Sequence, residues 1–276
     1  MDGLGGFELI QFGMPTLIER PGFRASLDLC NDLGLSFVEI NMNLPEYQIA
    51  ALDVSNMKKM LDDSGQFVTI HLDENLNICD FNPLIANANM ETILNTITLA
   101  KQLNIPILNM HMAEGVYFTL PDRKEFLFEK YSSFYLDKLY EFRSLCEEAI
   151  GENDITICIE NCGPYRSFQK EGIELLLESS CFGLTFDIGH DFSSDNANEQ
   201  FILAHRDKLK HMHVHDANRK GNHLALGTGE IDIASKLEIA KQNNCRCVLE
   251  IKTIEGLKQS VGRLSLIHIS EPTRPY

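Results

Sequence analysis

The stretch Ile155–His190 reads ITICIENCGPYRSFQKEGIELLLESSCFGLTFDIGH and contains two short apolar runs separated by a helical pattern. The runs Ile155–Glu160 and Gly183–Asp187 are almost continuously apolar, and each ends in a carboxylate. Such runs are typical of strands in a parallel sheet that is covered on both faces, because neither face meets water. The stretch therefore predicts a β-α-β unit with an acidic side chain at the end of each strand.

The same alternation recurs along the whole chain. We expect strands at Phe7–Phe12, Ser36–Met42, Phe67–Leu72, Ile105–Met112, Ile155–Glu160, Gly183–Asp187, Lys210–His215 and Cys245–Ile251. We expect helices at Asn56–Asp63, Met90–Leu103, Lys124–Ile150, Glu171–Glu178, Ala197–Asp207, Ile233–Gln242 and from Thr253 onward. Eight strands alternating with helices predict a single (β/α)₈ barrel of the α/β class. A doubly wound open sheet competes, but Gly13-Met14-Pro15 stands where such a sheet often has a GxGxxG fingerprint.

Composition limits the class of protein. The 276 residues suit one barrel, and 44% hydrophobic with 23% charged residues is an ordinary globular balance. We expect no transmembrane helix and no secretory signal, since the sequence lacks a long apolar run and a basic N-terminal region. The eight cysteines form no CxxC pair, which favours a reducing cytoplasm. The formal net charge of −16 argues against nucleic acid and anionic membranes as partners.

Polar residues end six consecutive predicted strands, at the edge where barrels of this kind place their active sites. These residues are His71, His111, Glu160, Asp187, His213 and Glu250. Any one of them alone is typical of a helix cap or a buried core histidine. Three neighbouring carboxylates, however, cannot all stay ionised unless a cation compensates their charge. We therefore predict one divalent ion held by Glu160, Asp187, His213 and Glu250. An oxygen-rich set favours Mn²⁺, with Mg²⁺, Co²⁺ or Zn²⁺ as alternatives.

Strand periodicity separates the histidines of the seventh predicted strand. His211, His213 and His215 share one face, since side chains alternate along a strand. We expect His213 to be the metal ligand, His211 to lie deeper in the core or behind the ligand, and His215 to begin the loop.

The ordered motifs around these residues resemble the sugar phosphate isomerase/epimerase family. This family belongs to the xylose isomerase-like TIM barrels, a superfamily that also contains endonuclease IV. The resemblance runs from about Phe7 to Arg263. It is carried by IEN at Ile159–Asn161, FDIGH at Phe186–His190, HVHDANR at His213–Arg219, HLALGTGEID at His223–Asp232 and LE at Leu249–Glu250.

The resemblance implies roles for particular residues. The family's metal ligands match Glu160, Asp187, His213 and Glu250, and substrate-contacting positions match His190 and Arg219. The additional histidines of the endonuclease IV branch match His71, His111, His190 and His223, which line the substrate pocket in sugar-active members. Gly221 stands where that branch has a metal-bridging aspartate, and this difference argues against the nuclease.

Two further features remain open at this level. The loop Gly227-Thr228-Gly229 either cradles a phosphate or forms a tight turn into a helix capped by Asp232, and we favour the turn. Glu39, at the end of the second predicted strand, either reaches the pocket or forms a structural salt bridge.

The sequence therefore predicts a cytoplasmic, metal-dependent isomerase or epimerase acting on a small sugar or sugar phosphate, with homo-oligomerisation left open. Glu160 and Glu250 are expected to move a proton at the carbon beside a carbonyl, through an enediolate that the metal stabilises. The alternatives are an inosose-type dehydratase, an endonuclease IV-like zinc nuclease for abasic sites, and a sugar-binding barrel without activity.

The C-terminal residues Leu264–Tyr276 differ from the rest. Leu264–Arg274 reads LSLIHISEPTR, which resembles the translation of a transposon-type sequencing adapter. We therefore expect a barrel domain over residues 1–263, a truncated eighth helix and a non-native tail over residues 264–276. His268 is accordingly left out of the candidate site.

Overall fold

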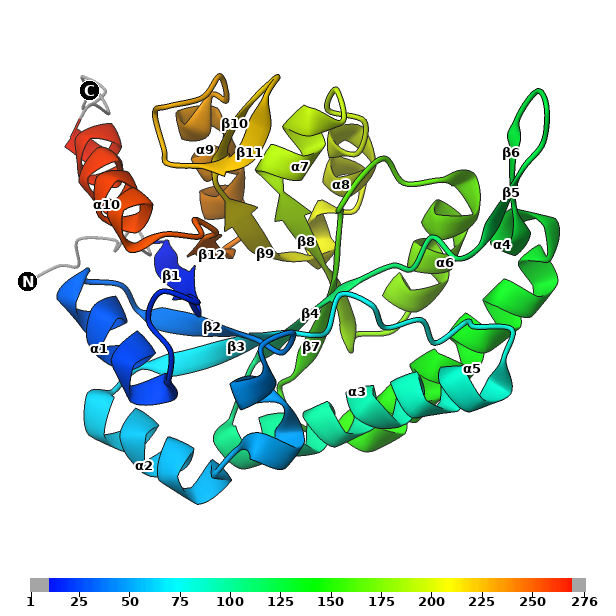
Figure 1. Cartoon of the computed structure of the whole chain (residues 1–276), viewed down its shortest axis with the longest axis horizontal. Coiled ribbons are helices and arrows are strands. Elements are labelled where there is room, and N and C mark those ends of the chain that lie inside the picture. The colour runs from blue at the N-terminus through cyan, green and yellow to red at the C-terminus, as the bar shows by residue number, and fades with distance from the viewer. Residues whose placement is uncertain (1–9, 270–276) are drawn as a thin grey trace, which may run out of the picture. The chain divides into compact units, whose positions relative to one another are not determined.

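The computed structural model describes residues 10–269 and divides the chain into two compact units. Unit 1 comprises Met1–Glu39 and Phe186–Tyr276, and unit 2 comprises Ile40–Thr185. The boundaries between the units fall inside β2 and β8, so each unit contains part of both strands. Figure 1 labels these two strands.

Unit 1 contains three complete strands of a parallel sheet. Strand β1 pairs in parallel with β2 and β12, and β12 pairs with β9. The hairpin β10–β11 is antiparallel and separate from this sheet. The strands are β1 (Gln11–Pro15), β2 (Phe37–Asn41), β8 (Phe182–Asp187), β9 (Leu209–Val214), β10 (Asp216–Asn218), β11 (Gly221–Leu224) and β12 (Arg246–Leu249). The helices are α1 (Phe23–Asp32), α7 (Ile188–Ser193), α8 (Glu199–Ala204), η3 (Arg206–Lys208), α9 (Ile233–Gln242) and α10 (Ile254–Ile269).

Unit 2 repeats the strand–helix alternation. Strand β4 pairs in parallel with β3 and β7, and β7 pairs with β8. The strands are β3 (Phe67–His71), β4 (Ile107–His111), β5 (Tyr117–Thr119), β6 (Lys124–Phe126) and β7 (Thr156–Glu160). The helices are η1 (Pro45–Tyr47), η2 (Ile49–Ala51), α2 (Val54–Ser64), α3 (Pro83–Leu103), α4 (Leu127–Lys130), α5 (Ser132–Ile150) and α6 (Ser167–Leu177).

Local sequence explains where several helices begin. The side chains of Asp53, Asn82 and Asp232 each accept a hydrogen bond from a backbone N–H in the first turn of α2, α3 and α9. Such caps satisfy N–H groups that have no partner inside the helix. Asp232 therefore acts as the predicted cap, and Asn82 followed by Pro83 explains why α3 begins seven residues before the predicted start at Met90.

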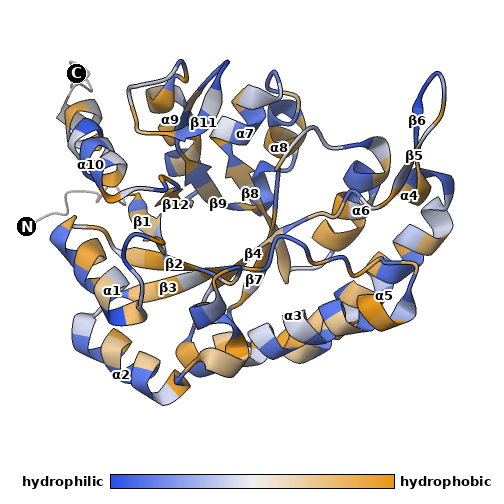
Figure 2. Ribbon diagram, viewed as in Figure 1, coloured by the Kyte–Doolittle hydropathy of each residue, from blue (hydrophilic) through white to orange (hydrophobic). Residues whose placement is uncertain are grey.

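Buried apolar side chains form the interior of each unit. Figure 2 shows apolar residues along β3, β4 and β7, and both polar and apolar residues on α3 and α5. In unit 2 a Cβ on Gly172 of α6 would lie 2.4 Å from Leu139 and 2.9 Å from Tyr135 of α5. A larger residue at this position would have to displace Leu139 and Tyr135, so glycine favours the close approach of these two helices.

Some element boundaries differ from the prediction. The stretch Lys124–Ile150 was predicted as one helix, but its first residues form β6, which pairs antiparallel with β5, and α4 precedes α5. The strand predicted at Phe7–Phe12 appears as β1 and continues to Pro15, while residues 7–9 lie outside the described part. The helix predicted at Ala197–Asp207 is shorter, as α8 followed by the turn η3.

The C-terminal helix passes the predicted domain boundary at Arg263. Helix α10 continues to Ile269, and Leu264 is buried whereas Leu266 is exposed. Residues 270–276 of the expected tail lie outside the described part. The non-native origin of residues 264–276 stays a prediction.

Candidate metal centre

Three of the four predicted metal ligands belong to unit 1, at the carboxyl ends of its strands. Asp187 ends β8, His213 is the penultimate residue of β9, and Glu250 directly follows β12. The register between β12 and β9 pairs Val248 with His213, which brings Glu250 to the end of the sheet where His213 lies. All three side chains are buried.

The donor atoms of these three residues, here named the Asp187 cluster, converge. The Nδ1 atom of His213 lies 3.8 Å from Asp187 Oδ2 and 3.4 Å from Glu250 Oε2. Ligands bound to one ion at 2.0–2.2 Å lie about 3.0–3.6 Å apart in tetrahedral or octahedral geometry. The spacing of one imidazole nitrogen and two carboxylate oxygens therefore fits a divalent cation.

Glu39 contacts the Asp187 cluster through the ring nitrogen of His213 that points away from Asp187 and Glu250. The sequence left open whether Glu39 reaches the pocket or forms a structural salt bridge. Its Oε1 atom lies 2.9 Å from His213 Nε2, and its Oε2 atom lies 2.9 Å from His211 Nε2. Burial would raise the pKa of Glu39, but His213 and His211 outweigh this effect and hold it below its ordinary value. A carboxylate on one ring nitrogen fixes the orientation of a histidine ligand, so Nδ1 of His213 turns toward Asp187 and Glu250.

His215 is a part of this site that the sequence prediction assigned only to a loop. Its Nδ1 accepts the backbone N–H of His223 at 2.8 Å, so the proton of the neutral ring is on Nε2, 3.1 Å from Asp187 Oδ2. Burial lowers the pKa of His215, but Asp187, Glu250 and the Asp216 backbone together outweigh this effect and hold it above its ordinary value. A Cβ on Gly189 would lie 1.9 Å from the His215 ring, so this position requires glycine.

Two predicted substrate-binding histidines lie beside the Asp187 cluster. His190 Nε2 is 4.0 Å from Asp187 Oδ2, and its Nδ1 accepts a hydrogen bond from Asn222 at 3.3 Å. His223 Nδ1 lies 3.2 Å from the backbone oxygen of Glu250. Burial lowers the pKa of His223 to about 4, which keeps its ring neutral at neutral pH. His190, His215, His223 and Glu250 also offer ligand atoms within 4.8 Å of one another.

Lys252 is a further neighbour that the sequence analysis did not single out. Its Nζ atom lies 2.6 Å from Glu250 Oε1. The sequence signal for this contact was a positively charged residue two positions after the glutamate that ends a predicted strand. The contact holds one oxygen of Glu250 and leaves Oε2 directed at His213.

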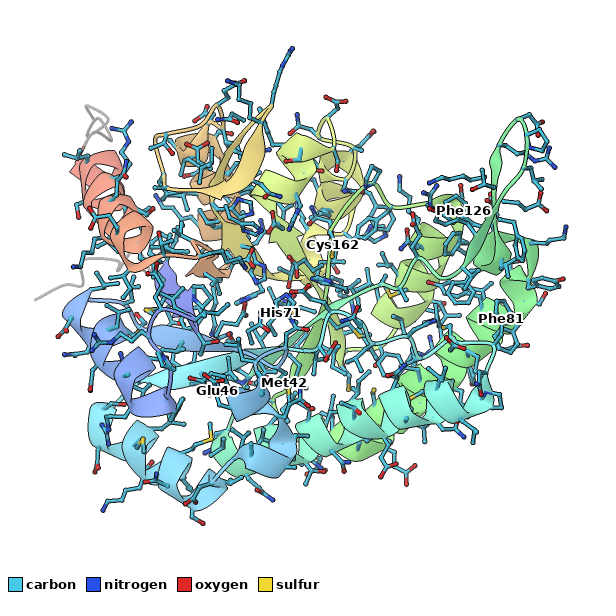
Figure 3. The ribbon with its side chains drawn as sticks, in the orientation of Figure 1. Met42, Glu46, His71, Phe81, Phe126 and Cys162 are labelled. Atoms are coloured by element: carbon cyan, nitrogen blue, oxygen red, sulfur yellow. The ribbon has the colours of Figure 1, made fainter. Side chains whose placement is uncertain are left out.

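The fourth predicted ligand, Glu160, ends β7 in unit 2 and has its own partners, here named the Glu160 cluster. His71 Nε2 lies 3.3 Å and His111 Nε2 lies 3.0 Å from Glu160 Oε2, which also accepts a hydrogen bond from Asn109. The parallel register pairs His111 with Glu160 directly. His71, labelled in Figure 3, donates Nδ1–H to the backbone oxygen of Leu72 at 2.8 Å. The structure thus brings two predicted substrate-binding histidines onto this glutamate.

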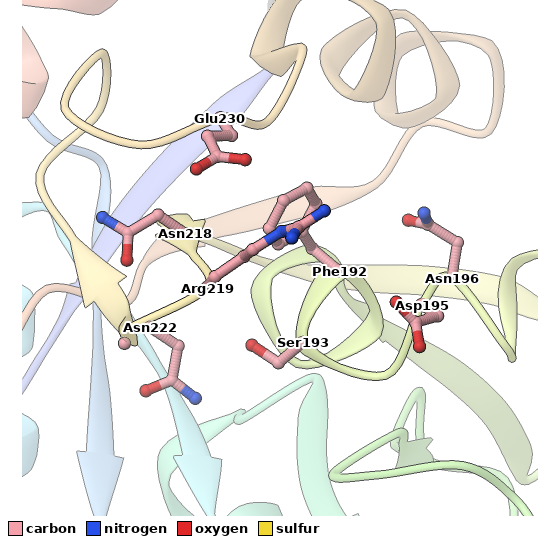
Figure 4. A pocket seen from close by; sticks show the side chains of 9 residues that line it. Phe192, Ser193, Asp195, Asn196, Asn218, Arg219, Asn222 and Glu230 are labelled. Atoms are coloured by element: carbon pink, nitrogen blue, oxygen red, sulfur yellow. The ribbon is translucent and has the colours of Figure 1, made fainter.

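The last predicted site residue, Arg219, lines an open cavity of about 630 Å³ in unit 1 (Figure 4). Its walls come from the end of α7, the loop after it and the β10–β11 hairpin. Asn222 lines this cavity and also contacts His190, so the cavity adjoins the Asp187 cluster. Arg219 is not itself in contact with the three metal-ligand candidates of unit 1.

The glycine loop before α9 forms a turn, as favoured from the sequence. The backbone N–H groups of Gly227 and Gly229 both donate to Asp216 Oδ2, at 2.9 and 2.8 Å. Those of Ala217 and Ile231 donate to Oδ1 of the same carboxylate, at 2.9 and 3.1 Å. An internal carboxylate therefore uses the amides that a phosphate would need.

Comparison with known proteins identifies the family. The family model for xylose isomerase-like TIM barrels matches residues 27–265, most of the chain. The chain belongs to this family, which confirms both the predicted (β/α)₈ barrel and the resemblance found in the motifs.

Individual relatives agree with this assignment. An uncharacterized protein of Methanocaldococcus jannaschii is 26% identical over 200 residues, covering 70% of this chain and 73% of that protein. A D-tagatose 3-epimerase-like protein superimposes with a TM-score of 0.76 at 22% identity, covering 94% of this chain and 97% of the other. The 3-keto-D-glucoside 4-epimerase of E. coli gives 0.73 at 14% identity, covering 95% and 100%. At these identities the structures show a shared fold.

The helices and the cysteines bear on two sequence predictions, the lack of a transmembrane helix and a reducing environment. Among the described residues, no helix combines the length and the apolar character needed to cross a membrane. All eight cysteines carry free thiols, and six of the eight are more than nine-tenths buried. The cytoplasmic location stays a prediction.

Proposed function

We propose that this protein is a divalent-metal-dependent isomerase or epimerase that moves a proton next to the carbonyl of a sugar. The convergence of Asp187, His213 and Glu250 carries this proposal. Two buried carboxylates beside an imidazole whose far nitrogen faces Glu39 form a donor set suited to a hard or borderline cation. The structural similarity to epimerases of ketoses and keto-glucosides supports the sugar as the substrate class.

The residues that would hold the ion are Asp187, His213 and Glu250, and we assign Glu160 as the fourth ligand from its equivalent place at a strand end. We expect Mn²⁺, with Mg²⁺, Co²⁺ or Zn²⁺ as alternatives. Once bound, the cation supplies Lewis-acid polarisation of the substrate's carbonyl and hydroxyl oxygens.

The proton transfer itself falls to the two glutamates. We assign the removal or return of a proton to the Glu250 carboxylate, whose Oε1 contacts Lys252 and whose Oε2 faces His213. Glu160 is assigned the opposite step, with His111 positioned to donate a hydrogen bond to its carboxylate and His71 beside the same oxygen. His190, His223 and Arg219 are assigned to orienting the substrate.

Metal analysis and isotope exchange test this function together. The purified protein should contain close to one divalent ion per chain, and a ketose incubated with it in deuterated water should gain deuterium beside the carbonyl, as followed by NMR. Removal of metal by a chelator should stop the exchange, and adding Mn²⁺ back should restore it. Loss of water from an inosose would instead favour a dehydratase. Three zinc ions with cleavage of abasic DNA would favour a nuclease.

A further inference from the structure

The buried carboxylate of Asp216 occupies a loop where barrels of this kind commonly bind the phosphate of a substrate. Barrels often bind phosphate near the loops that follow their last two strands, through backbone N–H groups. In this chain the corresponding Gly227-Thr228-Gly229 loop directs its amides at Asp216, which is 1% exposed. A phosphate placed there would meet a buried carboxylate and find these N–H groups already occupied.

The cavity around Arg219 is poorly suited to phosphate for a second reason. Among its nine lining residues Arg219 is the cation, while Asp195 and Glu230 are both acidic. Figure 4 shows the Arg219 side chain lying across the cavity, with Glu230 and Ser193 on opposite sides in this view. A phosphate monoester, which carries nearly two negative charges, would be attracted by Arg219 and repelled by both Asp195 and Glu230.

The remaining polar lining suits hydroxyl groups. The side chains of Ser193, Asn196, Asn218 and Asn222 offer both donors and acceptors. Carboxylates accept from hydroxyl groups, and an arginine donates to them, so every polar side chain of the cavity has a role with a polyol. Asn222 connects this lining to His190, which lies beside Asp187.

We propose that the Arg219 cavity binds a neutral, hydroxyl-rich part of the substrate, so that the protein acts on unphosphorylated sugars. This inference rests on the proposed function and specifies the substrate class of the same site. The reacting carbons would lie at the metal-ligand candidates, and the hydroxyls further along the sugar would lie against Arg219, Asn218 and Asn222.

Matched substrate pairs provide the main test. Each of D-fructose, D-tagatose and D-allulose is compared with its own phosphate monoester at the terminal carbon, using the Mn²⁺-loaded protein and deuterium exchange by NMR. We expect kcat/KM for the free sugar to exceed that of its ester by at least about tenfold, because the ester meets Asp195 and Glu230. A preference for the esters would overturn the inference while leaving the proposed isomerase function intact.

Charge variants test whether the cavity is the cause. In the double variant Asp195→Asn/Glu230→Gln, the ratio of ester to free-sugar kcat/KM should rise by about tenfold or more, because two like charges are removed. The matched control Asp28→Asn/Glu238→Gln removes the same charge from exposed positions on α1 and α9 and should leave the ratio unchanged. An equal rise in the control would show that net charge, and not this cavity, sets the preference.

Phosphate binding is measured separately, so that a failed activity assay still gives a result. Titration calorimetry with inorganic phosphate at millimolar concentrations should show no saturable binding to the metal-free protein. Saturable binding that Arg219→Ala abolishes would overturn the inference. If no sugar of the panel exchanges deuterium and phosphate does not bind, the proposed function fails on these substrates, whereas the exclusion of phosphate stands.

Discussion

The two candidate proton-transfer glutamates have different surroundings. Glu250 in unit 1 contacts a cation, Lys252, at 2.6 Å, while the described contacts of Glu160 in unit 2 are the imidazoles of His71 and His111 and the amide of Asn109. A lysine compensates carboxylate charge directly, whereas imidazole and amide groups mainly direct hydrogen bonds. The difference suggests unequal roles, with one glutamate fixed by charge and the other by hydrogen bonding.

The largest expected effect comes from neutralising each glutamate in turn. Glu250→Gln and Glu160→Gln should each lower kcat by about 10²- to 10⁴-fold, because an amide cannot accept the proton. Steady-state kinetics and metal content measured on the same samples separate loss of proton transfer from loss of the ion. Glu238→Gln on the surface of α9 is the matched control and should keep wild-type activity. Full activity in either site variant would remove that glutamate from the mechanism.

Glu39 allows the support of the Asp187 cluster to be tested without touching a ligand. Glu39→Gln should weaken metal binding about 10- to 100-fold, because the carboxylate that orients His213 loses its charge. Competition with a chromogenic chelator measures the affinity, and circular dichroism confirms folding. Glu39→Asp, which keeps the charge on a shorter side chain, should recover part of the loss. Affinity within twofold of wild type in Glu39→Gln would assign Glu39 a structural role only.

Lys252 tests whether its charge creates the difference between the two glutamates. Lys252→Met should lower kcat/KM by about two- to fivefold, the usual range for a partly exposed ion pair. The effect should shrink at high salt, because exposed charges are screened. Lys241→Met, which removes a lysine 3.9 Å from Glu238 on α9, serves as the control. Equal losses in the two variants would mean that Lys252 has no particular role.

Cysteine labelling also compares the two units, and among these predictions it is expected to affect activity least. Cys162, labelled in Figure 3, follows β7 near Glu160 and is exposed, while Cys247 in β12 is fully buried. Burial raises the pKa of Cys247 well above its ordinary value, so its thiolate form is scarce at neutral pH. Iodoacetamide followed by mass spectrometry should label Cys162 first, and Cys162→Ser should lose this rapid phase. Rapid labelling of Cys247 in the native protein would contradict the burial of β12.

The sequence predicted the fold because strands, helices and strand-end residues follow local periodicity. Asp187, His213 and Glu250 were found in this way, since each ends an apolar run. The hairpin β5–β6 was missed because Lys124–Phe126 becomes a strand only through pairing with Tyr117–Thr119. Local pattern alone favoured the helix that follows.

The supporting contacts of the site could not be predicted from local sequence. Glu39 and His211 are 172 positions apart, and only the folded sheet brings them together. His215 was placed in a loop because the apolar run ends there, yet the close approach of Gly189 encloses its ring. The four backbone N–H groups that converge on Asp216 could not be read from its motif, because three of them come from Gly227, Gly229 and Ile231 in the loop before α9.

The separation between Glu39 and its histidines also affects synthesis of the protein. Glu39 leaves the ribosome well before His211 and His213 are added, because chains grow at about 5–20 residues per second. Until then the Glu39 carboxylate lacks the two imidazoles that it contacts in the folded protein. Closing so long a loop costs conformational entropy, which is offset only by contacts that form late. The candidate ligand His213 therefore acquires its orientation near the end of translation. A nascent chain that ends before β9 should be unable to keep this charge buried, which makes the contact a late checkpoint in folding.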